Sequence, residues 1–195
     1  DDIEIYNSET DNFIKLHFLR QQVKKNQDQF CLSDFIAPSK LKKKDWIGAF
    51  ALTTGIGLEE MVNRFELEGD DYNSIMAKAL ADRLAEAFAE KLHQLARTAY
   101  WGYAKEDDLS FDSILKEKYD GIRPAPGYPA CPDHSEKQTL FNILGAESKI
   151  KIKLTSSFAM DPPASVCGWY FSHPESKYFG IGKISEDQLI DYSNR

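Results

Sequence analysis

The residue types best suited to bind a small charged ligand lie in the most proline-rich stretch of the chain. Residues 121–132 contain four prolines and two glycines, and proline fixes backbone angles before any ligand arrives. Within this stretch, Arg123 offers a planar guanidinium for a carboxylate or a phosphate. Gly127 lets the backbone approach a ligand closely, and Tyr128 offers a flat face with a polar tip. The stretch therefore predicts a stiff loop that can cradle an anionic group.

The same loop also has a purely structural interpretation. It could be a rigid crossover between two elements, with Arg123 in an ordinary surface ion pair. The residues of the loop alone favour neither interpretation. After the loop, Asp133 is followed three residues later by Glu136, a spacing typical of a helix N-cap, and we expect that helix to end at Gly145.

The histidines and cysteines show no spacing typical of a metal site or a redox pair. They are spread along the chain at His17, His93, His134, His173, Cys31, Cys131 and Cys167. We therefore expect no metal ligands in this chain. Cysteines without paired spacing favour a reduced, cytoplasmic protein.

The charge balance argues against nucleic acid as a partner. The 195 residues carry a formal net charge of −7, whereas binding to phosphate backbones depends on clustered Lys and Arg. The one basic run, residues 40–44, predicts a solvated loop, with docking of an acidic partner as the alternative. No apolar run approaches the roughly 20 residues of a membrane-spanning helix, and the N-terminus lacks the charge of a signal peptide. We expect a soluble protein without membrane contact.

Chain length and composition predict one domain. Hydrophobic residues make up 42% and charged residues 28% of the chain, an ordinary balance for a globular protein. A chain of 195 residues closes one sizeable core and leaves little room for a second, so we expect a single domain over residues 1–195. Because the chain begins at Asp1 without a Met, we expect a piece of a larger protein.

The clearest element is a long amphipathic helix from about Asp71 to about Thr98. Asp70 and Asp71 at its start and Arg97 near its end suit the helix dipole. Its apolar residues recur at spacings of three and four, as a helix with one apolar stripe requires. They are Met76, Leu80, Leu84, Ala87, Phe88, Leu92 and Leu95.

Shorter elements flank this helix. The apolar run Trp46–Leu52 predicts a buried strand, and Leu58–Phe65 predicts a helix. The segment Phe13–Lys25 fits either a strand or a helix. Ser110–Lys118 predicts a short helix with Ser110 as its cap.

The C-terminal part of the chain has a strand-like pattern. Its strand candidates are residues 150–154, Val166–Phe171 and Tyr178–Gly182. Ser185 and Gln188 then predict the cap of a final short helix. Taken together, the elements predict an α+β fold with a bent, mainly antiparallel sheet, flanking helices and one long amphipathic helix.

The proline-rich loop and its continuation resemble a family motif. From Arg123 to Lys137 the sequence is Arg-Pro-Ala-Pro-Gly-Tyr-Pro-Ala-Cys-Pro-Asp-His-Ser-Glu-Lys. This string closely resembles the S-adenosylmethionine-binding motif of the activation domain of cobalamin-dependent methionine synthases. The resemblance covers nearly the whole chain and includes residues 70–73, 78–90, 157–160 and 168–172. Domains of this family are longer at the N-terminal end, so the chain resembles an N-terminally truncated member.

The resemblance implies a set of ligand-binding residues. In this family the arginine of the motif, here Arg123, holds the carboxylate of S-adenosylmethionine. The other implied positions are Ala125, Gly127, Tyr128, Ala130, Tyr178, Phe179, Glu86 and Glu117. Without the resemblance, Glu86 would be expected to be solvated or paired with Arg83 on its own helix.

The resemblance also implies a reaction. The domain would bind S-adenosylmethionine and present its methyl group for reductive remethylation of cob(II)alamin, which another domain of the parent methyltransferase holds. No residue of this chain is then required as a catalytic acid or nucleophile, and the chain alone is not expected to make methionine. The implied partners are the cobalamin-binding domain and flavodoxin or a flavoprotein reductase, and zinc would lie only on a separate domain.

Two alternatives remain open. The chain could be a docking module for the cobalamin domain and the reductase, without ligand binding of its own. It could also be a free-standing reactivator of another corrinoid protein.

Overall fold

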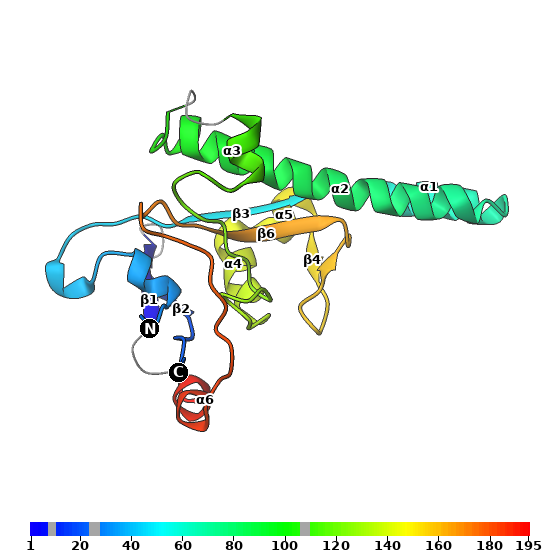
Figure 1. The fold of residues 1–195 in the computed structure, drawn as a ribbon. Helices are drawn as coiled ribbons and strands as arrows, with labels where there is room; N and C mark the ends of the chain where they lie inside the picture. Colours follow the sequence, from blue (N-terminus) through cyan, green and yellow to red (C-terminus); the bar gives the residue numbers. More distant parts are fainter. Residues whose placement is uncertain (8–10, 24–27, 106–109) are drawn as a thin grey trace.

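The computed structural model describes residues 1–7, 11–23, 28–105 and 110–195 (Figure 1). Its strands pair antiparallel, β1 with β2, β3 with β6 and β4 with β5. The predicted α+β class is therefore confirmed, but the strands form separate two-stranded ladders and not one bent sheet. In chain order the elements are β1 (Asp2–Asn7), β2 (Asn12–His17), η1 (Leu32–Phe35), η2 (Ser39–Leu41), β3 (Gly48–Thr53), α1 (Leu58–Leu67), α2 (Asp71–Leu95), η3 (Ala96–Tyr100), α3 (Phe111–Leu115), α4 (Glu136–Leu144), α5 (Ala146–Ile150), β4 (Lys153–Leu154), β5 (Met160–Asp161), β6 (Ser165–Tyr170) and α6 (Glu186–Ser193).

The ladder of β3 and β6 organises the fold. Figure 1 shows it between α2 on one side and α4 and α5 on the other. Because successive side chains of a strand point to opposite faces, Phe50 packs against alanines of α2, whereas Ala49 packs in the main core. The predicted buried strand at Trp46–Leu52 is confirmed, although it begins at Gly48.

The proline-rich loop runs beside β6 as an irregular edge. Ile122 and Phe171 exchange two backbone hydrogen bonds of 3.0 Å, and the Trp169 N–H donates to the Pro124 carbonyl at 2.9 Å. Gly168 lies opposite this contact, and a Cβ there would stand 2.8 Å from the Pro124 carbonyl oxygen. Prolines cannot donate hydrogen bonds, so the segment cannot extend into a regular strand. The loop is nevertheless fixed to β6, on both sides of Arg123.

The long helix α2 buries a different face from the one that its apolar stripe predicts. Met76, Leu80, Leu84 and Phe88 are 39–59% exposed, whereas the face toward the ladder carries small residues. The α2 residues buried on that face are Ser74, Ala81, Ala85, Ala89 and His93. Small side chains allow the helix backbone to approach the ladder closely, which larger side chains would prevent. The helix itself is confirmed, since it begins at Asp71 and is capped by Asp70.

The end of α2 changes its winding. Five residues, Ala96–Tyr100, continue the helix as a wider π turn, a feature that often occurs at functional sites. Arg97 lies in this turn and is fully buried. At the other end of α2, the predicted helix at Leu58–Phe65 is confirmed as α1, which packs against α2.

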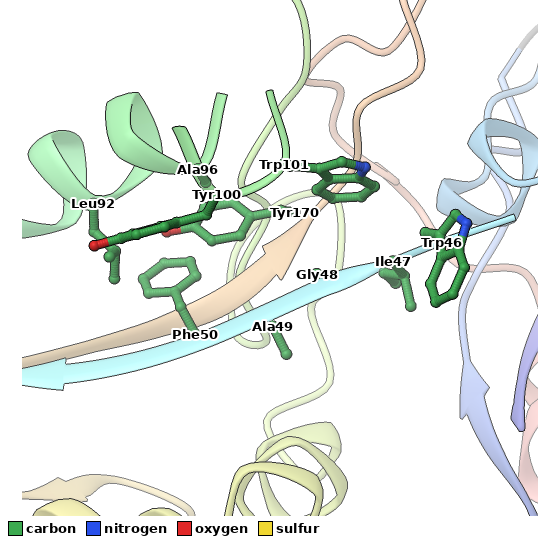
Figure 2. A pocket seen from close by; sticks show the side chains of 10 residues that line it. All are labelled: Trp46, Ile47, Gly48, Ala49, Phe50, Leu92, Ala96, Tyr100, Trp101 and Tyr170. Carbon is green, nitrogen blue, oxygen red and sulfur yellow. The ribbon is translucent and has the colours of Figure 1, made fainter. Parts of the chain in front are cut away.

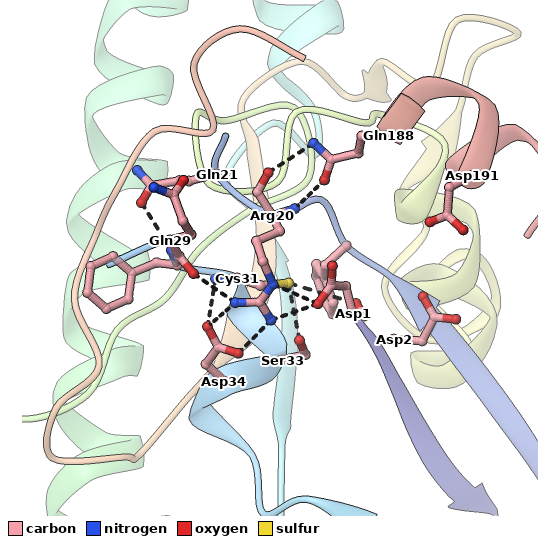
Figure 3. Close-up of polar contacts among 12 residues, drawn as sticks. Asp1, Asp2, Arg20, Gln21, Gln29, Cys31, Ser33, Asp34, Gln188 and Asp191 are labelled. Carbon is pink, nitrogen blue, oxygen red and sulfur yellow. Dashed lines mark hydrogen bonds and ion pairs between the residues drawn. The ribbon is translucent and has the colours of Figure 1, made fainter. Parts of the chain in front are cut away.

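A cluster of ion pairs around Arg20 joins the N-terminal and C-terminal parts of the chain (Figure 3). The Arg20 guanidinium donates to the carboxylates of Asp1 and Asp34 and to the Gln29 carbonyl at 2.6–2.9 Å. The Gln188 side chain accepts from the Arg20 N–H at 2.7 Å and donates to the Arg20 carbonyl at 2.9 Å. Helix α6 is therefore fixed against the segment that follows β2.

Several predicted elements differ from the observed ones. The ambiguous segment Phe13–Lys25 is a strand up to His17 and irregular up to residue 23, with its last two residues outside the described ranges. Ile150 belongs to α5, so the predicted strand at 150–154 shrinks to two residues. Tyr178–Gly182 is not a strand, although the Ile181 N–H donates to the Pro129 carbonyl at 2.9 Å. Isolated backbone contacts replace a ladder there.

The predicted helix caps have mixed outcomes. Ser110 caps α3 by accepting from the Ser113 N–H at 3.2 Å, and α4 ends at Gly145 in the left-handed region, both as predicted. Ser185 makes no side-chain cap on α6, and the Gln188 side chain is directed toward Arg20, while the Ser185 N–H donates to Gln22 at 3.0 Å. Asp133 accepts from the Ser135 N–H at 2.8 Å and thus lies one turn before α4, where it orders the entry to the helix.

Within the described ranges, no helix combines the length and hydropathy needed to cross a membrane. Those same ranges hold no group of three or more potential metal ligands.

Candidate functional site

A cleft of about 460 Å³ lies where α2, the proline-rich loop, β6 and the segment after it meet. Phe50, Val166 and Cys167 of the central ladder form its apolar wall. Of the nine residues that the sequence implied for a ligand site, all except Gly127 line this cleft. They are Glu86, Glu117, Arg123, Ala125, Tyr128, Ala130, Tyr178 and Phe179. The fold therefore brings together residues that are up to 93 positions apart, from Glu86 to Phe179.

Arg123 is held at two points. Its backbone N–H donates to the Tyr178 hydroxyl at 3.0 Å, and its Nη2 donates to Glu90 Oε2 at 2.7 Å. The side chain is 19% exposed, and its buried Nε has no hydrogen-bond partner among the described residues. The buried Nε is closed to an incoming ligand, but a guanidinium has five N–H donors, and Arg123 lines the cleft with a partly exposed side chain.

The sequence interpretation missed Glu90, His93 and Arg97. With Glu86 they are spaced four, three and four residues apart, which places all four on one side of α2. This polar spacing was a usable signal, but the large apolar residues beside it drew the prediction to the other face. Glu86 lines the cleft, whereas Glu90, His93 and Arg97 continue behind Arg123.

Arg97 is the least satisfied of these polar residues. Its side chain has no exposure, and none of its three nitrogens makes a hydrogen bond to a described residue. Its guanidinium carbon lies 3.8 Å from the centre of the Tyr119 ring, a cation–π contact, and its Nη2 lies 3.9 Å from Glu90 Oε1. Arg97 and Arg123 therefore share one carboxylate.

Apart from Glu90, the titratable side chains next to these two arginines are neutral. Burial, together with the charges of Arg97 and Arg123, lowers the pKa of His93 to about 2, so the ring carries no charge and stacks on Tyr170. Burial and the Glu90 charge raise the pKa of Tyr119 to about 12. Burial raises the pKa of Tyr178. The phenols are therefore protonated at neutral pH, and the cluster holds two cations against one anion.

Two carboxylates line the cleft without a partner. Glu86 and Glu117 are exposed and make no ion pair with a described residue, so the pairing of Glu86 with Arg83 is not found. Glu117 follows α3 with a φ of 50°, a left-handed conformation that is uncommon for a residue other than glycine. Both carboxylates are free to face a cation in the cleft.

Gly127 has a structural reason to be glycine. Its φ is +95°, and a Cβ would lie 2.3 Å from the ring of His134. Its N–H donates to the Cys131 carbonyl at 2.7 Å, and the Tyr128 N–H donates to Ala125 at 3.1 Å. This tight turn presents Tyr128, which is 60% exposed, at the rim of the cleft. Close approach to a ligand is not needed to explain the glycine.

A second hollow of about 540 Å³ lies near the end of α2 (Figure 2). Aromatic rings surround it, including Phe50 and Tyr170 from the ladder and the exposed Trp46 and Tyr100. Phe50 borders both this hollow and the cleft of Arg123. The hollow has no charged lining residue, so it offers no ionic partner to the carboxylate of a ligand.

Comparison with known proteins identifies the chain at the family level. The family model for the activation domain of vitamin B12 dependent methionine synthase matches residues 1–195. The chain belongs to this family. The resemblance carried by the motif from Arg123 to Lys137 is thereby confirmed.

A solved structure from the methionine synthase family agrees in fold. It is described as the crystal structure of the MetH reactivation domain bound to AdoHcy, is 54% identical in sequence and superposes with a TM-score of 0.93. The match covers 99% of this chain and 60% of that chain. The chain thus spans three fifths of the length of this relative, with the same fold throughout.

Proposed function

We propose that the cleft binds S-adenosylmethionine and presents its methyl group for the reactivation of the cobalamin of a methionine synthase. The observation that carries the proposal is the charge arrangement of the cleft. Arg123 lines the cleft with a partly exposed, positively charged side chain, and Glu86 and Glu117 line the same cleft without an ion pair to a described residue. The AdoHcy in the related structure is a ligand of the same chemical class.

The three charges of S-adenosylmethionine match these side chains. Its carboxylate suits the guanidinium of Arg123, because charge-assisted bonds to a planar fork are strong and directional. Its ammonium and sulfonium suit the carboxylates of Glu86 and Glu117 and the aromatic faces of Tyr128 and Tyr178. Ala125 and Ala130 keep the floor of the cleft small, and Phe179 closes its side.

Placement is the main contribution of the chain to the reaction. The cobalamin of the parent enzyme, held on another domain, supplies the reduced cobalt that accepts the methyl group. The residues of the cleft would hold the amino-acid end of the ligand and leave its methyl group accessible, which turns a collision into an oriented approach. The carboxylates favour the cationic ligand more than a transition state that loses positive charge, so they would serve binding and not the chemical step.

The rest of the assembly remains a prediction. We expect the cobalamin-binding domain of the same enzyme and flavodoxin or a flavoprotein reductase as partners, zinc on a separate domain, and a cytoplasmic location. We expect the methyltransferase activity to belong to the parent enzyme, with this chain binding the methyl donor.

Isothermal calorimetry with S-adenosylhomocysteine tests the proposal. We expect the wild-type chain to bind and Arg123→Ala to lose about 100-fold in affinity, since truncation removes a charge-assisted bond in a partly buried site. Arg83→Ala is the matched control, because Arg83 is exposed on α2 and forms no ion pair with a described residue. Absent binding by the wild type would contradict the proposal and favour a docking module, and equal binding by Arg123→Ala would remove the role of the arginine.

A further inference from the structure

We infer that Glu90, which lies between Arg123 and Arg97 behind the cleft, is a positioning residue that holds the Arg123 guanidinium toward the ligand carboxylate. This inference rests on the proposed function, because it concerns how the cleft distinguishes a ligand with a carboxylate from one without. Glu90 itself does not line the cleft. Any effect on the ligand must therefore pass through Arg123.

The contacts of Glu90 support a tether. Its Oε2 accepts from Arg123 Nη2 at 2.7 Å, within the short range of charge-assisted hydrogen bonds. Its other oxygen, Oε1, is buried, has no hydrogen bond among the described residues and lies 3.9 Å from Arg97 Nη2. The carboxylate is thus fixed by one arginine on each side and is not available to rotate toward the solvent.

The tether matters because an arginine side chain is long. Its rotamer freedom must be lost when a ligand binds, and a side chain already held in place loses less. The backbone of Arg123 is fixed by the Tyr178 hydroxyl and by the contacts of the loop with β6, but the guanidinium has Glu90 as its only hydrogen-bonded protein partner in the described ranges. The orientation of the guanidinium in the cleft therefore depends on Glu90.

The length of the Glu90 side chain and its negative charge lead to opposite predictions for substitutions at this position. If the position of Arg123 is what Glu90 provides, a replacement must keep the length and the acceptor, and Glu90→Gln suffices. If the negative charge matters, Glu90→Asp suffices instead. The charges of the cluster favour the role of position over that of negative charge. Arg97 and Arg123 carry one positive charge more than Glu90 neutralises, and this excess attracts a ligand carboxylate.

The experiment compares these two variants with two ligands. Calorimetry of the full chain uses S-adenosylhomocysteine and its decarboxylated amine, which lacks the group that Arg123 holds. We expect Glu90→Gln to bind S-adenosylhomocysteine within about threefold of wild type or more tightly, and Glu90→Asp to bind roughly tenfold more weakly. Both variants should bind the decarboxylated amine within about threefold of wild type, whereas a general disturbance of the cleft would weaken both ligands alike.

Three results would overturn the inference: Glu90→Asp binding like wild type, Glu90→Gln losing as much as Glu90→Asp, or parallel losses for both ligands. If Glu90→Asp does not fold, Glu90→Met takes its place, because it keeps the length but has no strong acceptor, and the same loss is expected. A result against the role of Glu90 can be distinguished from a result against the proposed function. Binding by the wild type and its loss in Arg123→Ala would remain even if Glu90 had no effect.

Discussion

Two clusters of arginines and carboxylates occur in this molecule, and they differ in how fully their hydrogen bonds are made. In the cluster at the junction of the chain ends, all three nitrogens of Arg20 donate to Asp1, Asp34 or the Gln29 carbonyl (Figure 3). In the cluster behind the cleft, the Arg97 guanidinium makes no hydrogen bond to a described residue, and Arg123 Nε has no partner there.

In these two clusters, the more deeply buried arginine makes fewer hydrogen bonds. The Arg20 side chain is 32% exposed and fully bonded, whereas the Arg97 side chain has no exposure and no hydrogen bond among the described residues. Buried polar groups are nearly always satisfied, and each exception costs on the order of 1–3 kcal/mol. We conclude that the first cluster stabilises the fold, while the second carries a stability cost directly behind the proposed ligand cleft.

The largest expected effect is on the cluster at the chain ends. We expect Arg20→Met to lower the free energy of unfolding by about 3 kcal/mol, because it removes the charge-assisted hydrogen bonds from the guanidinium to Asp1 and Asp34 and its bond to the Gln29 carbonyl. Ligand affinity should not change, since Arg20 lies outside the cleft lining. Urea unfolding measures the first quantity and calorimetry the second. A variant as stable as wild type would remove the structural role of this cluster.

The pH dependence of stability should also originate near the chain ends. Glu136 is 5% exposed, its Oε2 has no hydrogen bond in the described ranges, and burial raises its pKa to about 7 from the ordinary value of 4.5. The charges of Asp133 and Asp2 add to this rise, while His17 opposes it. Because the folded-state value is the higher one, the stabilising effect of the proton is full below pH 4.5. It is lost as the pH rises through about 7.

Replacing Glu136 by Gln tests this dependence. We expect Glu136→Gln to be more stable than wild type by up to about 3 kcal/mol above pH 7, a difference set by the two pKa values, and to approach wild type below pH 4.5. Urea unfolding across this pH range measures the difference, and Glu147→Gln is the exposed control. If the difference did not vary with pH, the carboxylate would not be the titrating group. The cleft should bind its ligand equally well in Glu136→Gln.

The residues alone predicted the proline-rich loop better than the ladders, whereas Glu86, Glu117, Tyr178 and Phe179 were implied for the site only by the family resemblance. The motif around Arg123 and Tyr128 is local, since prolines dictate the path of the loop before tertiary contacts form. The segment at Tyr178–Gly182 has the composition of a strand, yet its only described backbone contacts to the proline-rich loop are isolated ones. The proline-rich loop lacks the N–H donors that a ladder needs. The composition of Tyr178–Gly182 does not reveal that this loop is its neighbour.

The buried face of α2 could not be inferred from hydropathy. The helix carries large apolar residues on one side and alanines on the other, and both sides repeat with a period of about four residues. Because large apolar side chains have the more favourable transfer free energy, hydropathy predicts that they face the core. The close packing of α2 on the ladder, however, leaves space only for small side chains. The polar residues Glu90, His93 and Arg97 were overlooked for the same reason, because they share the alanine side.

The smallest expected effect separates the two clusters most directly. Methionine has a length similar to that of arginine without its charge, and removing the Arg97 charge leaves Glu90 paired with Arg123, so no buried charge loses its last partner. We therefore expect Arg97→Met to be as stable as wild type or more so, in contrast to Arg20→Met. Affinity for S-adenosylhomocysteine should fall by about fivefold, because the cluster loses the excess positive charge that favours a carboxylate, worth about 1 kcal/mol at such a position.

Paired measurements on Arg97→Met decide between the two roles. Urea unfolding gives the stability and calorimetry gives the affinity, with Arg83→Met as the control for loss of an exposed charge on the same helix. A large loss of stability with unchanged affinity would place Arg97 in the same class as Arg20, and the difference between the clusters would then be one of geometry alone. A loss of affinity without loss of stability requires the opposite conclusion, that the buried charge of Arg97 is retained for the ligand, because the fold gains nothing from keeping it.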